Sequence, residues 1–253
     1  MAEHHFKRTG RQWQLACLAW LMLLSPLCQG TESKPTLALA IIDGLLYEHY
    51  PHLAYNQLLN YLDLTETKGY KRHFFPIARA YKLFRDKAFD CVFPASAKYL
   101  NGEGALLETI PVNYSKSYLF TLVPTNFSDL MLDKRKIIGK IRGYTYGNTV
   151  DRFAQHSSID VATNEQLIQL MLKGRADAII AYAPDIFIIA ERYKIRQLHY
   201  PVNQPLSVHN ESFVCHSSEP SKRFIQSLDR DIRLMEQSSM LEQILGSNRL
   251  SKD

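Results

Sequence analysis

A unit of helix, turn, acidic residue and apolar strand occurs twice in this chain and constrains its fold more than any other feature. The first copy is YKLFRDKAFDCVFPA (81–95), and the second is QLMLKGRADAIIAYA (169–183). In each copy a turn containing basic residues follows the helix, and an aspartate, Asp90 or Asp177, precedes the buried strand. One domain rarely needs this unit twice. We therefore expect two α/β lobes.

The segments around the first copy alternate between apolar runs and helical stripes. Strands are predicted over 36–43, 71–77 and 89–96, and helices over 52–62 and 78–88. This β-α-β-α-β order is typical of a mainly parallel sheet with helices on its faces. The predicted fold class is therefore α/β.

The same order begins again near residue 136, which supports a second lobe. Strands are predicted over 136–143, 159–163 and 176–182, and Asn164 is expected to cap the helix that follows the second of them. The other expected elements are a loop or short helix over 101–110, an extended run over 111–124, helices over 149–157, 164–174 and 184–193, strands over 195–201 and 206–216, and one or two helices over 221–245.

Two extended runs are expected to connect the lobes and to act as a hinge. They lie near 115–124 and 206–215, so that one lobe comprises 31–120 together with 214–253, and the other comprises 121–213. A cleft between two hinged lobes is a natural ligand site.

The first thirty residues have the composition of a signal peptide. Lys7, Arg8 and Arg11 precede the apolar run LACLAWLMLL (15–24), and small residues follow near residue 30. The run is short for a membrane span. A retained N-terminal anchor is the alternative, and a lipoprotein modified at Cys28 is a weaker one. We expect secretion to the periplasm, with signal residues 1–30 removed.

Charge and cysteine content exclude some functions. Without residues 1–30 the chain has 27 lysine and arginine residues against 24 acidic ones, and they are interleaved, so no nucleic-acid surface is indicated. Cys91 and Cys215 remain, both in apolar strand-like runs. They would pair if their strands are adjacent in an oxidising compartment, and two buried free thiols are the alternative. No cysteine or histidine spacing indicates a metal, and no cofactor is expected.

Three motifs, taken in order, resemble the type 2 periplasmic solute-binding proteins of family 3, which includes binders of polar amino acids. They are Pro76-Ile77-Ala78-Arg79-Ala80, Arg142-Gly143-Tyr144-Thr145-Tyr146-Gly147 and Gly174-Arg175-Ala176-Asp177-Ala178-Ile179-Ile180. The resemblance covers residues 36 to about 246. It implies a two-lobe fold, a small polar ligand in the cleft, a monomer, and an inner-membrane permease or sensor as the partner.

The chain departs from the family at both positions that usually hold an amino acid. Where the resemblance implies an arginine for the ligand's carboxylate, the segment SAKYLNGEG (96–104) offers Lys98. Where it implies an aspartate for the ammonium group, this chain has Tyr182, with Asp185 three residues later. The loop after the first strand is shortened to GLLYEHY (44–50). A standard α-amino acid is therefore not the expected ligand.

Candidate ligand-binding residues are those that the two-lobe arrangement would bring to the cleft. Each has a structural alternative, such as a surface arginine, a solvated lysine, core tyrosines, or an ordinary strand-to-helix turn for the glycine motif. His199, His209 and His216 are interpreted as structural. The candidates are Asp43, Tyr47, Arg79, Ser96, Lys98, Tyr114, Arg142, Tyr144, Thr145, Tyr146, Tyr182 and Asp185.

The expected function is a periplasmic solute-binding protein for ABC-type uptake, not an enzyme. An orphan receptor for a membrane sensor is one alternative. A periplasmic dehydratase or lyase of the same fold is another, with Glu103 or Glu108 as its general acid or base. No nucleophile elbow and no phosphate-binding glycine loop support other enzyme classes.

Overall fold

The computed structural model describes residues 34–100, 104–144, 146 and 156–252. Residues Lys34–Asp253 form one compact unit. The predicted signal segment and most of the predicted helix over 149–157 lie outside the described residues. Among the helices that are described, none has the combined length and apolarity needed to cross a bilayer.

The first group of strands builds a sheet with a parallel half and an antiparallel edge. It contains β1 (Leu37–Ile41), β2 (Arg72–Pro76), β3 (Cys91–Ala95), β4 (Leu106–Glu108) and part of β9 (Ser207–His216). β1 pairs in parallel with both β2 and β3, and β9 runs antiparallel to β3 and β4. The strand β4 was not expected, since 101–110 was predicted as a loop or short helix.

Both faces of this sheet are covered, which explains the uninterrupted apolar sequence of β1. Leu37 and Leu39 point into a core shared with α2 (Ala54–Tyr61), α7 (Glu219–Gln237) and α8 (Met240–Leu245). Ala38 and Ala40 point to the other face, where α3 (Ile77–Arg85) packs. Parallel strands buried on both faces need such sequences.

The second group of strands repeats this plan. It contains β5 (Asn113–Phe120), β6 (Ile137–Ile141), β7 (Ser157–Val161), β8 (Ala178–Ala183) and the first half of β9. β6 pairs in parallel with β7 and β8, whereas β5 is antiparallel to β8 and β9. The helices α4 (Phe127–Leu132), α5 (Asn164–Leu172) and α6 (Asp185–Arg192) complete this lobe. The α/β class and the two-lobe plan are confirmed.

Two further local predictions were wrong. Thr163, not Asn164, caps α5, because its side chain accepts a hydrogen bond from the Gln166 N–H. The segment 195–201 is not a strand; it contributes one isolated bridge, between His199 and Thr121. Leu198 and Tyr200 of this segment pack into the hydrophobic core of the second lobe.

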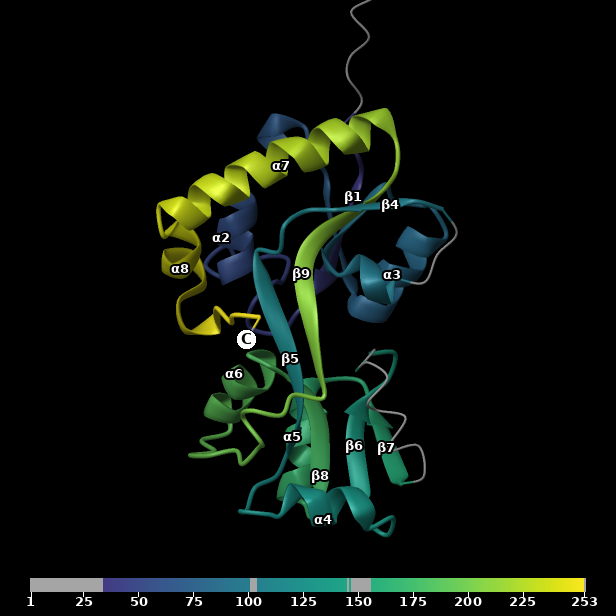
Figure 1. Ribbon diagram of the computed structural model, residues 1–253, viewed down its shortest axis with the longest axis vertical. Coiled ribbons are helices and arrows are strands. Elements are labelled where there is room, and N and C mark those ends of the chain that lie inside the picture. Colours follow the sequence, from purple (N-terminus) through teal and green to yellow (C-terminus); the bar gives the residue numbers. More distant parts are fainter. Residues whose placement is uncertain (1–33, 101–103, 145, 147–155, 253) are drawn as a thin grey trace, which may run out of the picture. The chain divides into compact units, whose positions relative to one another are not determined.

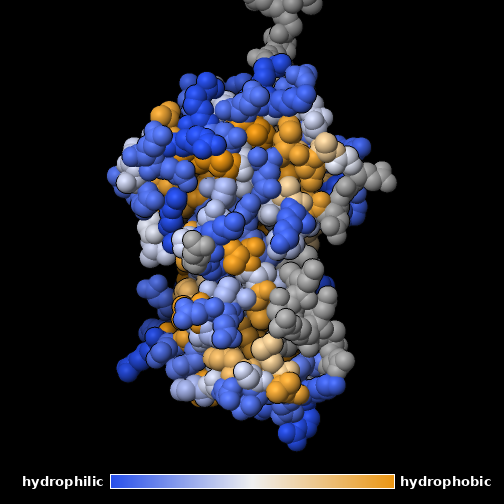
Figure 2. All heavy atoms as spheres, in the orientation of Figure 1, coloured by the Kyte–Doolittle hydropathy of each residue, from blue (hydrophilic) through white to orange (hydrophobic). Residues whose placement is uncertain are grey.

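β9 belongs to both sheets and is the strand that connects them. Its residues Ser207 to Glu211 pair with β5, and Ser212 to Cys215 pair with β3. Figure 1 shows β9 beside β5, the other long strand of the connection. On the face seen in Figure 2, hydrophilic residues cover much of the surface, and hydrophobic side chains show between them.

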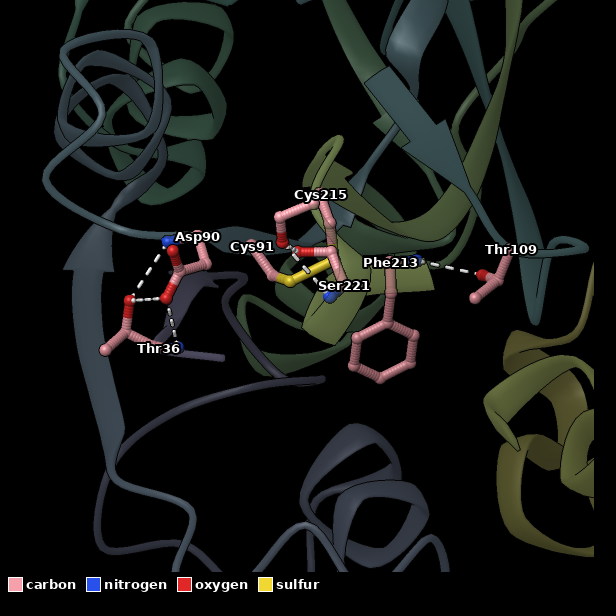
Figure 3. The surroundings of a disulfide bond; sticks show 8 residues. Thr36, Asp90, Cys91, Thr109, Phe213, Cys215 and Ser221 are labelled. Carbon is pink, nitrogen blue, oxygen red and sulfur yellow. Dashed lines mark hydrogen bonds between the residues drawn. A yellow bond between two sulfur atoms is a disulfide. The ribbon is translucent and has the colours of Figure 1, made fainter. Parts of the chain in front are cut away.

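A disulfide joins Cys91 of β3 to Cys215 of β9, two residues directly opposite each other in the sheet and 124 positions apart in sequence. Of the two alternatives left open by the sequence, pairing is the one observed. Figure 3 shows the bond next to Asp90 and Thr36, with Phe213 bonded through its N–H to the Thr109 hydroxyl at 3.1 Å.

Candidate functional site

A partly open cavity of about 60 Å³ is lined by residues from both sheets. Its position follows from topology, because the ends of β1, β3 and β8 and the middle of β9 meet there. Ligands of open α/β sheets bind outside the carboxyl ends of strands. The lining residues are Ile42, Ile77, Tyr81, Pro94, Ala95, Ser96, Tyr99, Ser115, Tyr144, Tyr182, Asp185, His209, Asn210 and Glu211.

Asp185 is the acidic group that the second lobe contributes to the cavity. It begins α6 directly after β8, and it is 4% exposed. Its Oδ1 atom has no hydrogen-bond partner among the described residues. Burial, and then the negative charge of Glu211, raise the pKa of Asp185 well above its ordinary value, against a hydrogen bond from its own backbone N–H. An unpaired buried carboxylate oxygen is costly, so a ligand donor would be stabilising here.

Glu211 is the second buried acid, and it lies on the connecting strand β9. Its Oε2 atom accepts a hydrogen bond from the hydroxyl of Tyr55. The Asn113 amide donates to the same hydroxyl at 3.1 Å. Burial raises the pKa of Glu211 to about 7, while the hydrogen bonds from Tyr55 and Asn113 oppose the rise. The Glu211 carboxyl group therefore titrates near neutral pH.

His209 also lines the cavity, in contrast to the purely structural role expected for it. Its Nε2 atom lies 2.7 Å from the Ser207 hydroxyl and 3.1 Å from the Tyr182 hydroxyl. The Tyr99 ring packs against it with centroids 3.9 Å apart. Burial, aided by the positive charge of Lys98, lowers the pKa of His209 to about 4. The imidazole is therefore neutral at pH 7 and brings no positive charge.

Four tyrosines form much of the cavity wall: Tyr81, Tyr99, Tyr144 and Tyr182. The Tyr144 and Tyr182 centroids are 6.0 Å apart. The Tyr81 hydroxyl donates to the carbonyl of Pro94 at 3.1 Å. Tyr146 lies behind this wall: its ring stacks on Tyr182 at 5.3 Å, and its hydroxyl accepts the Ile141 N–H at 3.0 Å.

The structure brings four of the residues predicted from sequence together at the cavity, namely Ser96, Tyr144, Tyr182 and Asp185. The others lie elsewhere. Tyr47 is 42% exposed and packs on Tyr50, and Arg79 is exposed with its guanidinium 5.6 Å from the Phe75 ring.

Some of the remaining candidates lie near the cavity without lining it. Lys98 is exposed, and its ammonium group lies 5.1 Å from the Tyr99 ring centroid. Tyr114 is half-buried on β5, next to the cavity residue Ser115, whose side chain takes the opposite face of the strand. Asp43 is half-buried, and burial with the charge of Glu165 raises its pKa.

Two candidates of the glycine motif complete the set. Arg142 is exposed, and its backbone N–H donates to the Val161 carbonyl at 2.9 Å. Thr145 lies outside the described residues.

Sequence reasoning missed the contribution of β9 to the site. Glu211 was detectable, because an ionisable residue stands inside a strand that ends in the apolar run FVC. Such a buried acid is retained only with partners or a function. Tyr81 and Tyr99 carried no comparable signal, since each sits in an amphipathic segment. Among the described residues, no cluster of three or more histidine, cysteine, aspartate or glutamate side chains could hold a metal ion.

Solved structures share this architecture over most of their length. The ligand-binding core of GluR0 in complex with L-glutamate is 12% identical, with a TM-score of 0.66, and the match covers 87% of this chain and 99% of that one. AbpA of Streptococcus pneumoniae, an amino-acid ABC transporter substrate-binding protein bound to L-arginine, is 15% identical, with a TM-score of 0.63 and coverages of 85% and 94%.

A third similar structure is AncCDT-1, an ancestral amino-acid-binding protein and precursor of cyclohexadienyl dehydratase. It is 12% identical, with a TM-score of 0.63, and the match covers 86% of this chain and 95% of that one. No protein-family model and no curated protein matches this chain. At these identities the likeness establishes the fold, which is the two-lobe fold of type 2 periplasmic binding proteins. Function has to be argued from the cavity.

Proposed function

We propose that this chain is a periplasmic solute-binding protein that closes on a small polar ligand in the cavity and delivers it to an ABC-type permease. The observation that carries the proposal is Asp185 Oδ1, a buried carboxylate oxygen without a partner among the described residues, in a cavity lined from both lobes. A ligand that contacts both lobes favours their closed arrangement through those differential contacts.

Location in an oxidising compartment is supported by the disulfide. Cys91 and Cys215 are buried and bonded to each other, and such bonds persist mainly outside the reducing cytosol. The same binding chemistry would serve a receptor that reports its ligand to a membrane sensor. The two roles differ in the membrane partner that the closed form recognises, not in the cavity.

The proposal is tested by a thermal-shift screen of the purified, disulfide-intact protein against amino acids, organic acids, amines and short peptides. A ligand present at about one hundred times its Kd stabilises the protein by about 2.7 kcal/mol. Calorimetry of each hit gives the affinity, and small-angle X-ray scattering with and without the hit reports closure. A screen in which no compound binds would contradict the proposal.

A dehydratase or lyase is the second candidate function, because of Glu211. A cavity acid whose pKa is about 7 suits general acid–base chemistry at neutral pH. The fold is shared with AncCDT-1, the precursor of a dehydratase. Turnover of a bound compound, lost in Glu211→Gln while binding is kept, would establish this function in place of binding alone.

A further inference from the structure

Acidic side chains line the cavity, without basic ones among the described lining residues. Its described lining residues include two carboxyl groups, on Asp185 and Glu211, and no lysine or arginine. Asp43 adds a third acid that acts on Asp185 from the first lobe. His209 is neutral at pH 7 because burial lowers its pKa. A ligand in the cavity therefore contacts two acidic side chains, Asp185 and Glu211, with Asp43 close by.

The Asp185 carboxyl group can accept one further hydrogen bond. Its Oδ1 atom is buried and receives no hydrogen bond from the described residues, whereas Glu211 is already bonded to Tyr55. A neutral donor would satisfy the hydrogen bond only. A cation donates the same hydrogen bond and also favours the ionised form of Asp185, against the burial and the Glu211 charge that raise its pKa, which makes a cation the stronger partner.

The tyrosine walls are suited to the same kind of ligand. Tyr81 and Tyr182 both line the cavity, and their hydroxyls are engaged with the Pro94 carbonyl and the His209 Nε2 atom. Aromatic faces attract ammonium and guanidinium groups, most strongly where water is excluded. Tyr99 and Tyr144 add two further rings to the wall.

A carboxylate on the ligand would have no basic partner in the described lining. Lys98 is exposed and does not line the cavity. A third carboxylate beside Asp185 and Glu211 would add like-charge repulsion in a buried site. Amino acids carry such a carboxylate, whereas the corresponding decarboxylated amines do not.

We infer that the solute is a small organic cation without a carboxylate group, an amine or guanidine, with Asp185 as its anionic partner and tyrosine rings as its walls. The inference rests on the proposed function and names the ligand class of that site. The cavity of about 60 Å³ limits the buried part of the solute to a few heavy atoms unless the lobes separate further.

Matched pairs of compounds test the inference, because each pair differs only by a carboxylate group. Calorimetry compares cadaverine with lysine, and agmatine with arginine, at pH 7.5. We expect at least one amine to bind with a Kd at least tenfold below that of its amino acid. Equal or tighter binding of the amino acids would overturn the inference and leave the proposed function standing. If no compound of a broad screen binds, both the proposed function and the inference about the ligand are contradicted.

Substitutions at Asp185 and Tyr182 then test where the cation binds. Asp185→Asn should weaken binding of the preferred amine at least tenfold. Asp86→Asn is the control: Asp86 is an exposed acid paired with Lys82, and its substitution should leave the affinity unchanged. Tyr182→Phe keeps the ring and should cost less than threefold, whereas Tyr182→Ala should cost tenfold or more. Thermal unfolding of each unliganded variant identifies a folding defect. Unchanged amine affinity in a folded Asp185→Asn protein, or amino-acid binding that depends on Lys98, would overturn the inference.

Discussion

The carboxylate of Asp90 holds the start of the neighbouring strand by accepting two hydrogen bonds from Thr36, one from its N–H and one from its hydroxyl, both 2.7 Å long. Asp177 does the same in the second lobe, where it accepts the Ile137 N–H at 2.8 Å and pairs with Lys136 at 2.9 Å. In both copies of the sequence unit, the aspartate that precedes one strand therefore holds the start of the neighbouring strand by hydrogen bonds.

Removing either anchor should lower stability without changing the cavity. Asp90→Ala and Asp177→Ala are each expected to reduce the free energy of unfolding by about 1 kcal/mol, because the bonds are partly exposed to solvent. Urea denaturation measures the losses. Both variants should bind the preferred ligand with unchanged affinity, so a large loss of affinity in either one would show that the anchor also shapes the site.

Glu211 should make the unliganded protein less stable as pH rises. Its pKa is about 7 in the folded chain against 4.5 for the ordinary value, so the unfolded chain loses its proton first. The resulting loss of stability begins near pH 4.5, is complete just above pH 7, and amounts to about 3 kcal/mol.

Glu211→Gln is the matched comparison for that prediction. The variant should lack this part of the pH dependence, and the contributions of Asp185 and Tyr55 should become smaller, because the charge of Glu211 helps to raise both pKa values. Urea denaturation at pH values from 4 to 8 measures the difference between the two curves. Parallel curves would mean that the folded-state pKa of Glu211 is ordinary.

Loss of the disulfide should destabilise the chain strongly. The bond closes a loop between residues 124 positions apart, and removing such a native cross-link costs about 2–5 kcal/mol. Wild-type protein should therefore unfold at lower urea concentration when dithiothreitol is present. The double variant Cys91→Ala, Cys215→Ala should already have the lower stability, and dithiothreitol should not change its urea unfolding curve. Indifference of the wild type to full reduction would contradict the prediction.

Alanine substitutions at two glycines distinguish the effect of backbone strain from the effect of contact between the lobes. Gly143 (φ 80°) would place an added Cβ 3.0 Å from the Ala78 Cβ of the other lobe, whereas Gly174 (φ 63°) would meet nothing within 4 Å. Gly143→Ala and Gly174→Ala should each cost about 1 kcal/mol of stability, because both positions are left-handed. Only Gly143→Ala should also weaken the tightest ligand of the screen, by about tenfold. Equal affinities in calorimetry would show that this contact does not limit closure.

The two-lobe architecture could be predicted because its signals are local and repeated. Asp90 and Asp177 each precede a buried strand, and the period of the apolar residues distinguishes strands from helices over most of the described chain. The segment 195–201 misled because a short apolar run packs equally well as a strand or as irregular chain.

The cavity was only partly predictable, because it is assembled from residues distant in sequence. Tyr182 and Asp185 stand at a strand end, where a ligand contact is expected. Tyr99 and His209 touch across more than one hundred positions, and nothing near either residue indicates the other. Arg79 was a candidate ligand contact, but its guanidinium is exposed and lies over the Phe75 ring, as in the surface-arginine alternative.

The cross-link between β3 and β9 has a consequence in the middle of β9, where Glu211 lines the cavity. Glu211, Phe213 and Cys215 share one face of this strand, so a slip by a single residue would bring Asn210 or Ser212 to the place of Glu211. The bond at Cys215 fixes the pairing of β9 with β3 at Cys91 and so opposes such a slip. If the proposed binding function holds, a covalent bond outside the cavity therefore helps to keep Glu211 at the cavity wall.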